Sequence, residues 1–292
     1  VHLSCHNLAG PCAMPASEHA AYLALAQQCA EEAGKRILEL AGRVKTLALK
    51  AGDDPTDPVT QLDKEIETFI VGRVRAAFPG HRIVAEEDHG EAWREALAAP
   101  GPAWVIDPID GTKNFIHGSV HCSCSIAVVE GGAPVVGVVA APLLGETYWA
   151  RLHAGAFCNG RRLEVSGVAE LRQAAVTYDI NSRRPEDVCL ALGWCERLLT
   201  AGLVQTLRCH GSAALEGCGV ARGRTEAHFE AGLDVWDVGA AWLIVAEAGG
   251  VVLGFDGRPL ESLGAFEGSV LFANRPSTGR RLLEYRLARP RL

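Results

Sequence analysis

Residues 103–112 read Ala-Trp-Val-Ile-Asp-Pro-Ile-Asp-Gly-Thr, which joins an apolar run to a cluster of oxygen ligands. The apolar part is rich in β-formers and predicts a short buried strand that ends in a loop at Asp107. Because a proline stiffens this loop, we expect the carboxylates of Asp107 and Asp110 to converge with the carbonyl of Ile109. Such an all-oxygen set suits a hard cation such as Mg²⁺. The alternative is a pair of ordinary Asp-Pro and Asp-Gly turns with no ligand.

The next residues predict an anion site beside these carboxylates. Gly111 permits close approach of the backbone, and Thr112 can begin a short helix. The first N–H groups of a helix have no partner within it and lie at the positive end of its dipole, so they can face a phosphate group. A cation and a phosphate are therefore expected side by side.

Three further acidic residues stand at the ends of apolar segments. Glu86 follows the apolar run 83–85, Asp63 lies at the start of a helical pattern, and Asp237 precedes an apolar helical stripe closed by Gly249 and Gly250. Each has a simpler interpretation: a solvated charge, a first-turn acid favoured by the helix dipole, and a helix cap.

Several motifs, taken together and in order, resemble those of the inositol monophosphatase family of magnesium-dependent, lithium-sensitive phosphatases. The matching segments are Glu86-Glu87, Asp107 to Phe115, Gly155 to Gly160, Gly211 to Ala214 and Trp236 to Gly250. The resemblance covers nearly the whole chain from about residue 17 onward. It implies a mixed α/β fold, a five-layered α-β-α-β-α sandwich of the inositol monophosphatase and fructose-1,6-bisphosphatase type, with the metal site between two halves and usually a homodimer.

The resemblance also implies the cofactor, which is about two to three Mg²⁺ ions per subunit. One ion would be held by Glu86, Asp107 and the Ile109 carbonyl, and a second by Asp107, Asp110 and Asp237. Two such ions can polarise the phosphoryl oxygens, activate a water for in-line attack and stabilise the leaving oxygen.

Catalytic roles follow from the same resemblance. Glu86 and Thr112 would orient the attacking water, with Asp63 accepting a hydrogen bond from the Thr112 hydroxyl. Asp237 would hold the water that protonates the leaving oxygen. The backbone N–H groups of Gly111 and Thr112 would bind the phosphate.

The organic part of the substrate would be contacted by residues that match family positions. These are Asp110, Ser182, Gly211, Ser212, Ala213 and Glu230. Glu230 suits a polyol because a carboxylate can accept hydrogen bonds from hydroxyl groups, although it could also be a strand-end acid facing solvent. We therefore expect inositol 1- or 4-monophosphate as the substrate. A histidinol-phosphate or sugar-phosphate phosphatase of the same fold, or a regulatory binding protein that reuses the fold, is the alternative.

Composition is consistent with a soluble, cytoplasmic enzyme. The chain has 292 residues, of which 48% are hydrophobic, so it can bury a large core. Its net charge of -7 argues against a nucleic-acid partner, because binding to the phosphate backbone draws on clustered lysine and arginine. There is no apolar run of the ~18 residues that a membrane span needs.

Ten cysteines do not have the spacing of a zinc site. Cys122 and Cys124 are expected on one face of a strand, while six others lie in apolar company and are expected to behave as small, reduced hydrophobic residues: Cys29, Cys158, Cys189, Cys195, Cys209 and Cys218. Reduced thiols favour a cytoplasmic location.

The expected domain organisation has three parts. The only methionine is Met14, so residues 1–16 are expected to be a disordered or added extension. Residues 17–164 would form an N-terminal half that carries most metal ligands, beginning with a helix capped by Ser17. Residues 165–292 would form a C-terminal half that carries Asp237 and the substrate contacts.

Overall fold

The computed structural model describes most of the chain, in five stretches. These are residues 16–43, 48–49, 58–87, 93–181 and 184–286. The expected extension over residues 1–16 lies outside the described residues, except for Ala16. The candidate substrate residue Ser182 also lies outside them.

A seven-stranded sheet forms the larger of the two main sheets. Its strands are β3 (Arg82–Ala85), β4 (Ala103–Asp110), β5 (Ser123–Glu130), β6 (Ala133–Ala141), β7 (Glu146–Arg151), β8 (Gly155–Cys158) and β9 (Arg161–Arg162). The strands follow one another in chain order across the sheet, and β3 is parallel to β4 while all other neighbours are antiparallel. The strand predicted to end at Asp107 continues to Asp110, with a register shift between the two aspartates.

A five-stranded sheet contains the later strands. They are β10 (Ala175–Tyr178), β11 (Thr206–Arg208), β12 (Ala227–Ala231), β13 (Val251–Leu253) and β14 (Ser269–Ala273). Their order is β11-β10-β12-β14-β13, so that β10 and β12 are parallel neighbours although β11 lies between them in sequence. A separate pair of short strands is formed by β1 (Ala48–Leu49) and β2 (Pro58–Val59).

Helices separate and cover the two sheets. They are α1 (Ala16–Leu40), α2 (Gln61–Ala77), α3 (Trp93–Ala98), α4 (Thr112–His117), α5 (Pro185–Thr200), α6 (Ala213–Ala221), α7 (Val235–Glu247) and α8 (Pro276–Leu283), with short 3₁₀ helices at Pro142–Leu144, Leu171–Gln173 and Leu263–Ala265. Because α1 already includes Ala16 and Ser17, the prediction that Ser17 caps it is wrong. Among the described residues, no helix is long and apolar enough to cross a membrane.

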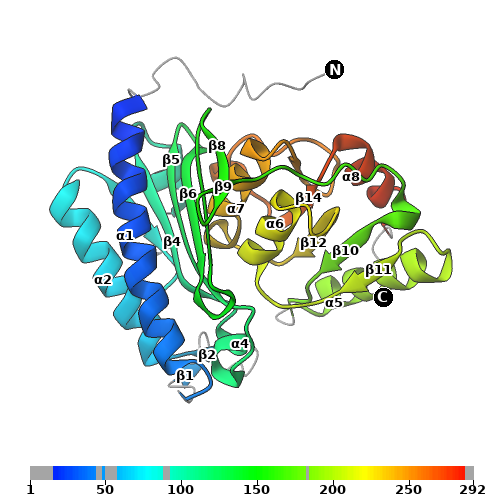
Figure 1. Ribbon diagram of the computed structural model, residues 1–292, viewed down its shortest axis with the longest axis horizontal. Coiled ribbons are helices and arrows are strands. Elements are labelled where there is room, and N and C mark those ends of the chain that lie inside the picture. The colour runs from blue at the N-terminus through cyan, green and yellow to red at the C-terminus, as the bar shows by residue number, and fades with distance from the viewer. Residues whose placement is uncertain (1–15, 44–47, 50–57, 88–92, 182–183, 287–292) are drawn as a thin grey trace.

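The elements stack in five layers, which confirms the predicted fold class. Helices α1 and α2 pack on one face of the seven-stranded sheet, α6 and α7 lie between the two sheets, and α5 and α8 cover the far face of the smaller sheet (Figure 1). The middle helix α7 is apolar on almost all sides, as expected for a helix buried between two layers. A Cβ at Gly137 of β6 would lie 2.7 Å from the carbonyl oxygen of Ala240, so glycine permits α7 to approach the sheet closely. The division into two halves at residue 165 stays a prediction.

Candidate active site

Three aspartates meet where the end of β4 faces the start of α7. The side chains of Asp107, Asp110 and Asp237 each offer an oxygen, and these atoms lie within 4.8 Å of one another. The register shift in β4 separates Asp107, paired with Ser125, from Asp110, paired with Ser123. Asp237 stands in the first turn of α7, where its Oδ2 accepts a hydrogen bond of 2.7 Å from the backbone N–H of Asp234. It therefore caps the helix and contributes to the cluster at the same time.

The electrostatics of this cluster fit a bound cation. Burial, together with the charges of Glu86, Asp110 and Asp237, raises the pKa of Asp107 well above its usual range. Burial also raises the pKa of Asp237, and it raises that of Asp110 to about 7 despite hydrogen bonds that favour the charged form. Within the described part of the chain, the buried Oδ1 of Asp107 has no hydrogen-bond partner. A divalent metal ion would relieve this repulsion and supply that partner.

Two further oxygen groups border the same cavity. Glu86 directly follows β3, and its N–H donates to the carbonyl of Ile106 at 3.1 Å. Ile109 lies in the shifted part of β4, and its carbonyl oxygen accepts a hydrogen bond from Thr112 Oγ1 at 3.0 Å. Both residues line the cavity that contains the three aspartates. All five predicted metal ligands are therefore together in space.

Thr112 and Asp63 are in contact, although 49 residues separate them in the chain. Thr112 Oγ1 lies 3.2 Å from Oδ1 of Asp63. Asp63 is completely buried and also caps α2, because its Oδ2 accepts hydrogen bonds from the N–H and the hydroxyl of Thr60. Its two interpretations, a first-turn acid and a partner for Thr112, therefore both hold geometrically.

Gly111 joins β4 to α4 in a conformation that requires glycine. Its φ is +84°, and a Cβ there would lie 2.8 Å from the carbonyl oxygen of His121 and 2.9 Å from that of Gly211. Helix α4 begins at the next residue, as predicted. Gly111 and Thr112 both line the cavity.

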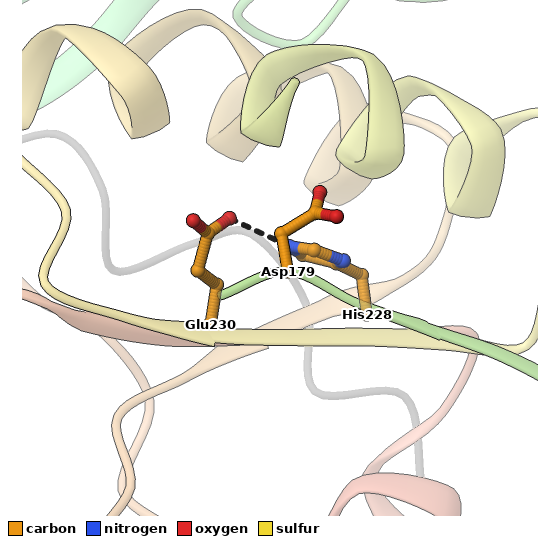
Figure 2. Close-up of side chains that lie close together, drawn as sticks. All are labelled: Asp179, His228 and Glu230. Carbon is orange, nitrogen blue, oxygen red and sulfur yellow. Dashed lines mark ion pairs between the residues drawn. The ribbon is translucent and has the colours of Figure 1, made fainter. Parts of the chain in front are cut away.

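The substrate candidates outside the metal cluster lie at or next to the same cavity, which has a volume of about 230 Å³. Gly211, Ala213 and Glu230 line it together with Lys113. Ser212 is buried behind this wall, where its hydroxyl donates to Asp110 Oδ2 at 2.6 Å. Glu230 is only 8% exposed, so the alternative of a solvent-facing acid is wrong. Its side chain points from the strand toward the helices above it (Figure 2).

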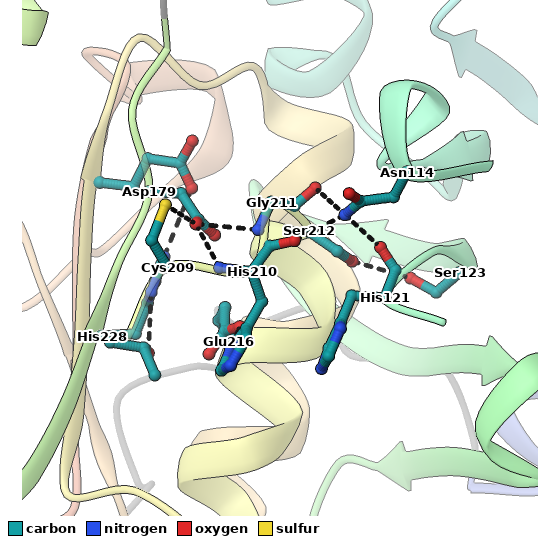
Figure 3. Close-up of polar contacts among 12 residues, drawn as sticks. Asn114, His121, Ser123, Asp179, Cys209, His210, Gly211, Ser212, Glu216 and His228 are labelled. Carbon is teal, nitrogen blue, oxygen red and sulfur yellow. Dashed lines mark hydrogen bonds and ion pairs between the residues drawn. The ribbon is translucent and has the colours of Figure 1, made fainter. Parts of the chain in front are cut away.

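Asn114 links the two sides of the site, a role that the sequence analysis missed. Its Nδ2 donates to the carbonyl oxygens of His121 at 2.7 Å and His210 at 2.6 Å, with that of Gly211 at 3.3 Å (Figure 3). One amide from α4 therefore holds both the start of β5 and the turn before α6. An amide side chain within the quoted motif was the only available signal.

A buried polar network behind Glu230 was also missed. It includes Asp179, which directly follows β10, and His228 on β12. Next to them, Nδ1 of His210 lies 2.7 Å from Glu216, which raises the pKa of this histidine, and the ring of His210 stacks on that of His121. The signal that could have identified part of this network is alternation, because Thr177 and Asp179, like His228 and Glu230, are two residues apart on a strand.

Two cysteines differ from the expectation of buried, apolar packing. Cys189 and Cys209 are exposed, and Cys209 Sγ donates to Asp179 Oδ1 at 3.1 Å, so the prediction is wrong for both. All eight cysteines in the described part of the chain have free thiols, and the remaining six are buried. Although Cys209 as a residue is exposed, its sulfur is partly buried against Asp179, and this burial, aided by the charge of Asp179, raises the pKa of the thiol to about 12.

A larger cavity of about 670 Å³ lies elsewhere, near Arg258 and Glu261. It is lined by side chains of both charges and contains none of the predicted site residues. The cluster of carboxylates around Asp107 therefore remains the candidate active site.

Comparisons with known proteins identify the family of the chain. The model of the inositol monophosphatase family matches residues 18–289. Inositol monophosphatase 1 of Bos taurus is 35% identical over 233 residues, which cover 80% of this chain and 83% of that protein. An inositol monophosphatase of Thermotoga maritima superposes with a TM-score of 0.79 at 32% identity, covering 90% of this chain and 96% of that one. Inositol monophosphatase II of Staphylococcus aureus with inositol monophosphate bound gives a TM-score of 0.72 at 28% identity, with 90% and 92% covered.

Proposed function

Because the chain belongs to the inositol monophosphatase family, whose members are phosphoric monoester hydrolases, we propose that it hydrolyses inositol 1- or 4-monophosphate with Mg²⁺ as cofactor. The observation that carries this proposal is the convergence of Asp107, Asp110 and Asp237 in a cavity that Gly111 and Thr112 also line. A carboxylate cluster beside backbone N–H groups suits a phosphate dianion held together with its counterions.

The ligand sets in this proposal are those implied by the family resemblance. Glu86, Asp107 and the Ile109 carbonyl would hold one Mg²⁺, and Asp107, Asp110 and Asp237 a second, with about two to three ions per subunit. Bound Mg²⁺ would supply charge neutralisation and lower the pKa of a water. The buried Asp107 Oδ1, which has no hydrogen-bond partner among the described residues, supports this assignment.

The chain's own groups would orient the reactants. Glu86 and the Thr112 hydroxyl would orient the attacking water, and the contact of Thr112 Oγ1 with Asp63 supports this role because it fixes the threonine side chain. The N–H groups of Gly111 and Thr112 would bind the phosphoryl oxygens without needing to reorganise during the reaction. Asp237 would orient the water that protonates the leaving oxygen.

The organic part of the substrate would lie against Glu230, Gly211 and Ala213, with Asp110 as a further contact. A buried carboxylate on the cavity wall supports a polyol, because it can accept hydrogen bonds from hydroxyl groups that replace lost hydration. Ser182 completes the proposed set, whereas Ser212, buried behind the cavity wall, would act through its hydrogen bond to Asp110. The proposal also includes a homodimer in the cytoplasm, the latter supported by the free thiols of the described cysteines.

A panel of phosphate esters with Mg²⁺ tests the proposal. The panel would contain inositol 1- and 4-phosphate, histidinol phosphate, fructose 1,6-bisphosphate, a sugar 1-phosphate and a nucleoside 3′-phosphate. We expect the highest kcat/KM for an inositol phosphate. A preference for another ester would leave a phosphatase with a different substrate. No hydrolysis of any ester by folded protein would favour the regulatory alternative.

A further inference from the structure

A second group of buried ligand atoms lies next to the proposed substrate pocket. His228 and Glu230 are alternate residues of β12, and Asp179 directly follows the neighbouring parallel strand β10. Their side chains all point from one face of the sheet toward the helices (Figure 2). Each offers one ligand atom, and the three atoms lie within 4.8 Å of one another.

The two carboxylate oxygens of Asp179 differ in their hydrogen bonding. Its Oδ1 accepts from the backbone N–H groups of His210 at 2.9 Å and Gly211 at 2.8 Å, and from Cys209 Sγ at 3.1 Å (Figure 3). Its Oδ2 is buried and has no hydrogen-bond partner among the described residues. The three donors therefore hold the carboxylate rigidly while the second oxygen stays available.

His228 is held in the same way. Its Nδ1 lies 3.1 Å from Thr177 Oγ1, whose own hydroxyl points to the carbonyl oxygen of Ala227 at 3.5 Å. The contact with Thr177 uses Nδ1, so Nε2 is the ring nitrogen that faces Glu230. Nε2 lies 3.4 Å from Glu230 Oε2, and beyond this pair neither atom has a hydrogen-bond partner in the described part of the chain.

We propose that Asp179, His228 and Glu230 form a Zn²⁺ site that is separate from the carboxylate cluster at Asp107. Imidazole nitrogen with two carboxylates is a ligand set for Zn²⁺ rather than for Mg²⁺, which prefers oxygen alone. With neutral His228, the two buried carboxylates carry a charge of about -2, which a divalent ion would neutralise, and binding of the ion would release the proton of a protonated His228 to solvent. Thr177 is the outer partner that orients the histidine, an arrangement typical of metal-binding imidazoles.

The fourth ligand position of this site opens toward the cavity, because Asp179 and Glu230 are both part of the cavity wall. Zn²⁺ bound there occupies the carboxylate that, in the proposed function, accepts the hydroxyls of the substrate. Zn²⁺ therefore inhibits the phosphatase by competing with the organic part of the substrate. This consequence rests on the proposed function, whereas the binding site does not.

Zn²⁺ binding is measured first, without any enzyme assay. The parent protein carries Asp107→Asn, which disables the carboxylate cluster, and Zn²⁺ alone is titrated in competition with a chromophoric chelator. We expect one tightly bound Zn²⁺ per chain. A second change, His228→Asn, keeps an amide that can hydrogen-bond to Thr177 but removes Nε2. It should weaken Zn²⁺ binding by more than about 100-fold, which is the most that loss of an outer partner usually costs. Thr177→Val should weaken it by about 10- to 100-fold.

The matched control is His210→Asn, which removes a neighbouring imidazole and leaves all three ligands in place. It should bind Zn²⁺ as the parent does. No tight Zn²⁺ in the parent, or equal affinity in the His228→Asn protein, would overturn the site and leave an ion pair only. If circular dichroism shows that His228→Asn does not fold, Thr177→Val and Glu230→Gln decide the question in its place.

The second measurement uses the otherwise unmodified chain with saturating Mg²⁺. Zn²⁺ should raise the KM for inositol monophosphate, and His228→Asn should remove this effect at the same Zn²⁺ concentration. If Zn²⁺ inhibits the His228→Asn protein equally, it acts at the proposed Mg²⁺ ligands instead. That result would overturn the proposed competition between Zn²⁺ and the organic part of the substrate. A chain without phosphatase activity that still binds Zn²⁺ through His228 would refute the proposed function but not the site.

Discussion

The Ser212 hydroxyl donates a hydrogen bond of 2.6 Å to Oδ2 of Asp110, across 102 residues of sequence. The backbone N–H of Ala214 donates to the same oxygen at 2.9 Å. Both bonds favour the charged carboxylate and oppose burial, which raises the pKa of Asp110 to about 7. A serine from the turn before α6 therefore favours the ionised form of a proposed metal ligand.

Ser212→Ala should weaken the response to Mg²⁺. A hydrogen bond to a charged group contributes about 1.5–3 kcal/mol, so the Mg²⁺ concentration for half-maximal activity should rise by about tenfold or more. Since loss of the bond raises the pKa of Asp110 further, the acid limb of the activity profile should move to higher pH. Ser123→Ala is the control, because Ser123 Oγ lies 3.4 Å from Ser212 Oγ and, among the described residues, does not hydrogen-bond the Asp110 carboxylate. Equal effects of both changes would contradict the assignment.

Asp107→Asn should abolish phosphatase activity and leave the fold intact. The amide cannot supply the charge that the proposed bridging carboxylate gives to two cations, so several kcal/mol of transition-state stabilisation should be lost. Steady-state turnover and circular dichroism check this, with the exposed Asp256→Asn as a control. Retention of more than about a tenth of the turnover, equivalent to ~1.4 kcal/mol, would refute the two-metal assignment.

Glu230→Gln should alter the preference among phosphate esters more than the rate of the hydrolysis step itself. Its buried carboxylate is proposed to accept substrate hydroxyls, so kcat/KM for inositol monophosphate should fall much more than kcat/KM for 4-nitrophenyl phosphate. Glu216→Gln, which changes a buried glutamate outside the cavity wall, gives the comparison. An equal loss on both esters would make Glu230 a structural support.

How much of this site the sequence could predict depends on the separation of its parts. Asp107, Ile109 and Asp110 lie within one short segment, so their convergence followed from a strand and a stiff turn. The register shift that continues β4 to Asp110 could not be predicted, because it depends on pairing with Ser123 and Ser125 of β5. Asp107 and Asp237 lie 130 residues apart in the chain, and only the family resemblance implied that they meet.

The network around His228 shows a second limit. Alternation within each strand was readable, but pairing was not, because β10 and β12 are neighbours in the sheet while β11 lies between them in the chain. The contact of Cys209 with Asp179 depends on this order of strands, so the sequence did not reveal it, and Cys209 was predicted to lie in an apolar environment. Local patterns therefore predicted single elements, such as the strand before Asp107 and the helix at Asp237, whereas contacts between distant strands required the structure.

Activity should require Mg²⁺ in about the millimolar range, as expected for partly hydrated sites. Li⁺ should inhibit uncompetitively with respect to substrate, because by resemblance it replaces the ion at Asp110 and Asp237 after the ester is cleaved and holds the phosphate product. Initial rates against Mg²⁺, with and without Li⁺, check both points. Full activity in excess chelator would refute the metal mechanism, whereas insensitivity to Li⁺ would show only that the second site differs.

Glu146 provides a test of stability far from these ligands. Burial would raise its pKa, but hydrogen bonds and charges from Arg224, Tyr148 and Arg222 outweigh it and lower the pKa to about 2. A lowered folded-state pKa stabilises the fold above the unfolded pKa of about 4.5 and loses this effect as pH falls toward about 2. Glu146→Gln should therefore reduce the free energy of unfolding at pH 7, by only about 1–2 kcal/mol because solvent screens the charges of the partly exposed arginines.

Urea unfolding should show this difference shrinking between pH 4.5 and pH 3. The control is Glu284→Gln, in an exposed ion pair with Arg281, which should change stability little at either pH. A difference between Glu146→Gln and the unmodified chain that stays constant as pH falls would show that packing, rather than the ionised carboxylate, accounts for the loss.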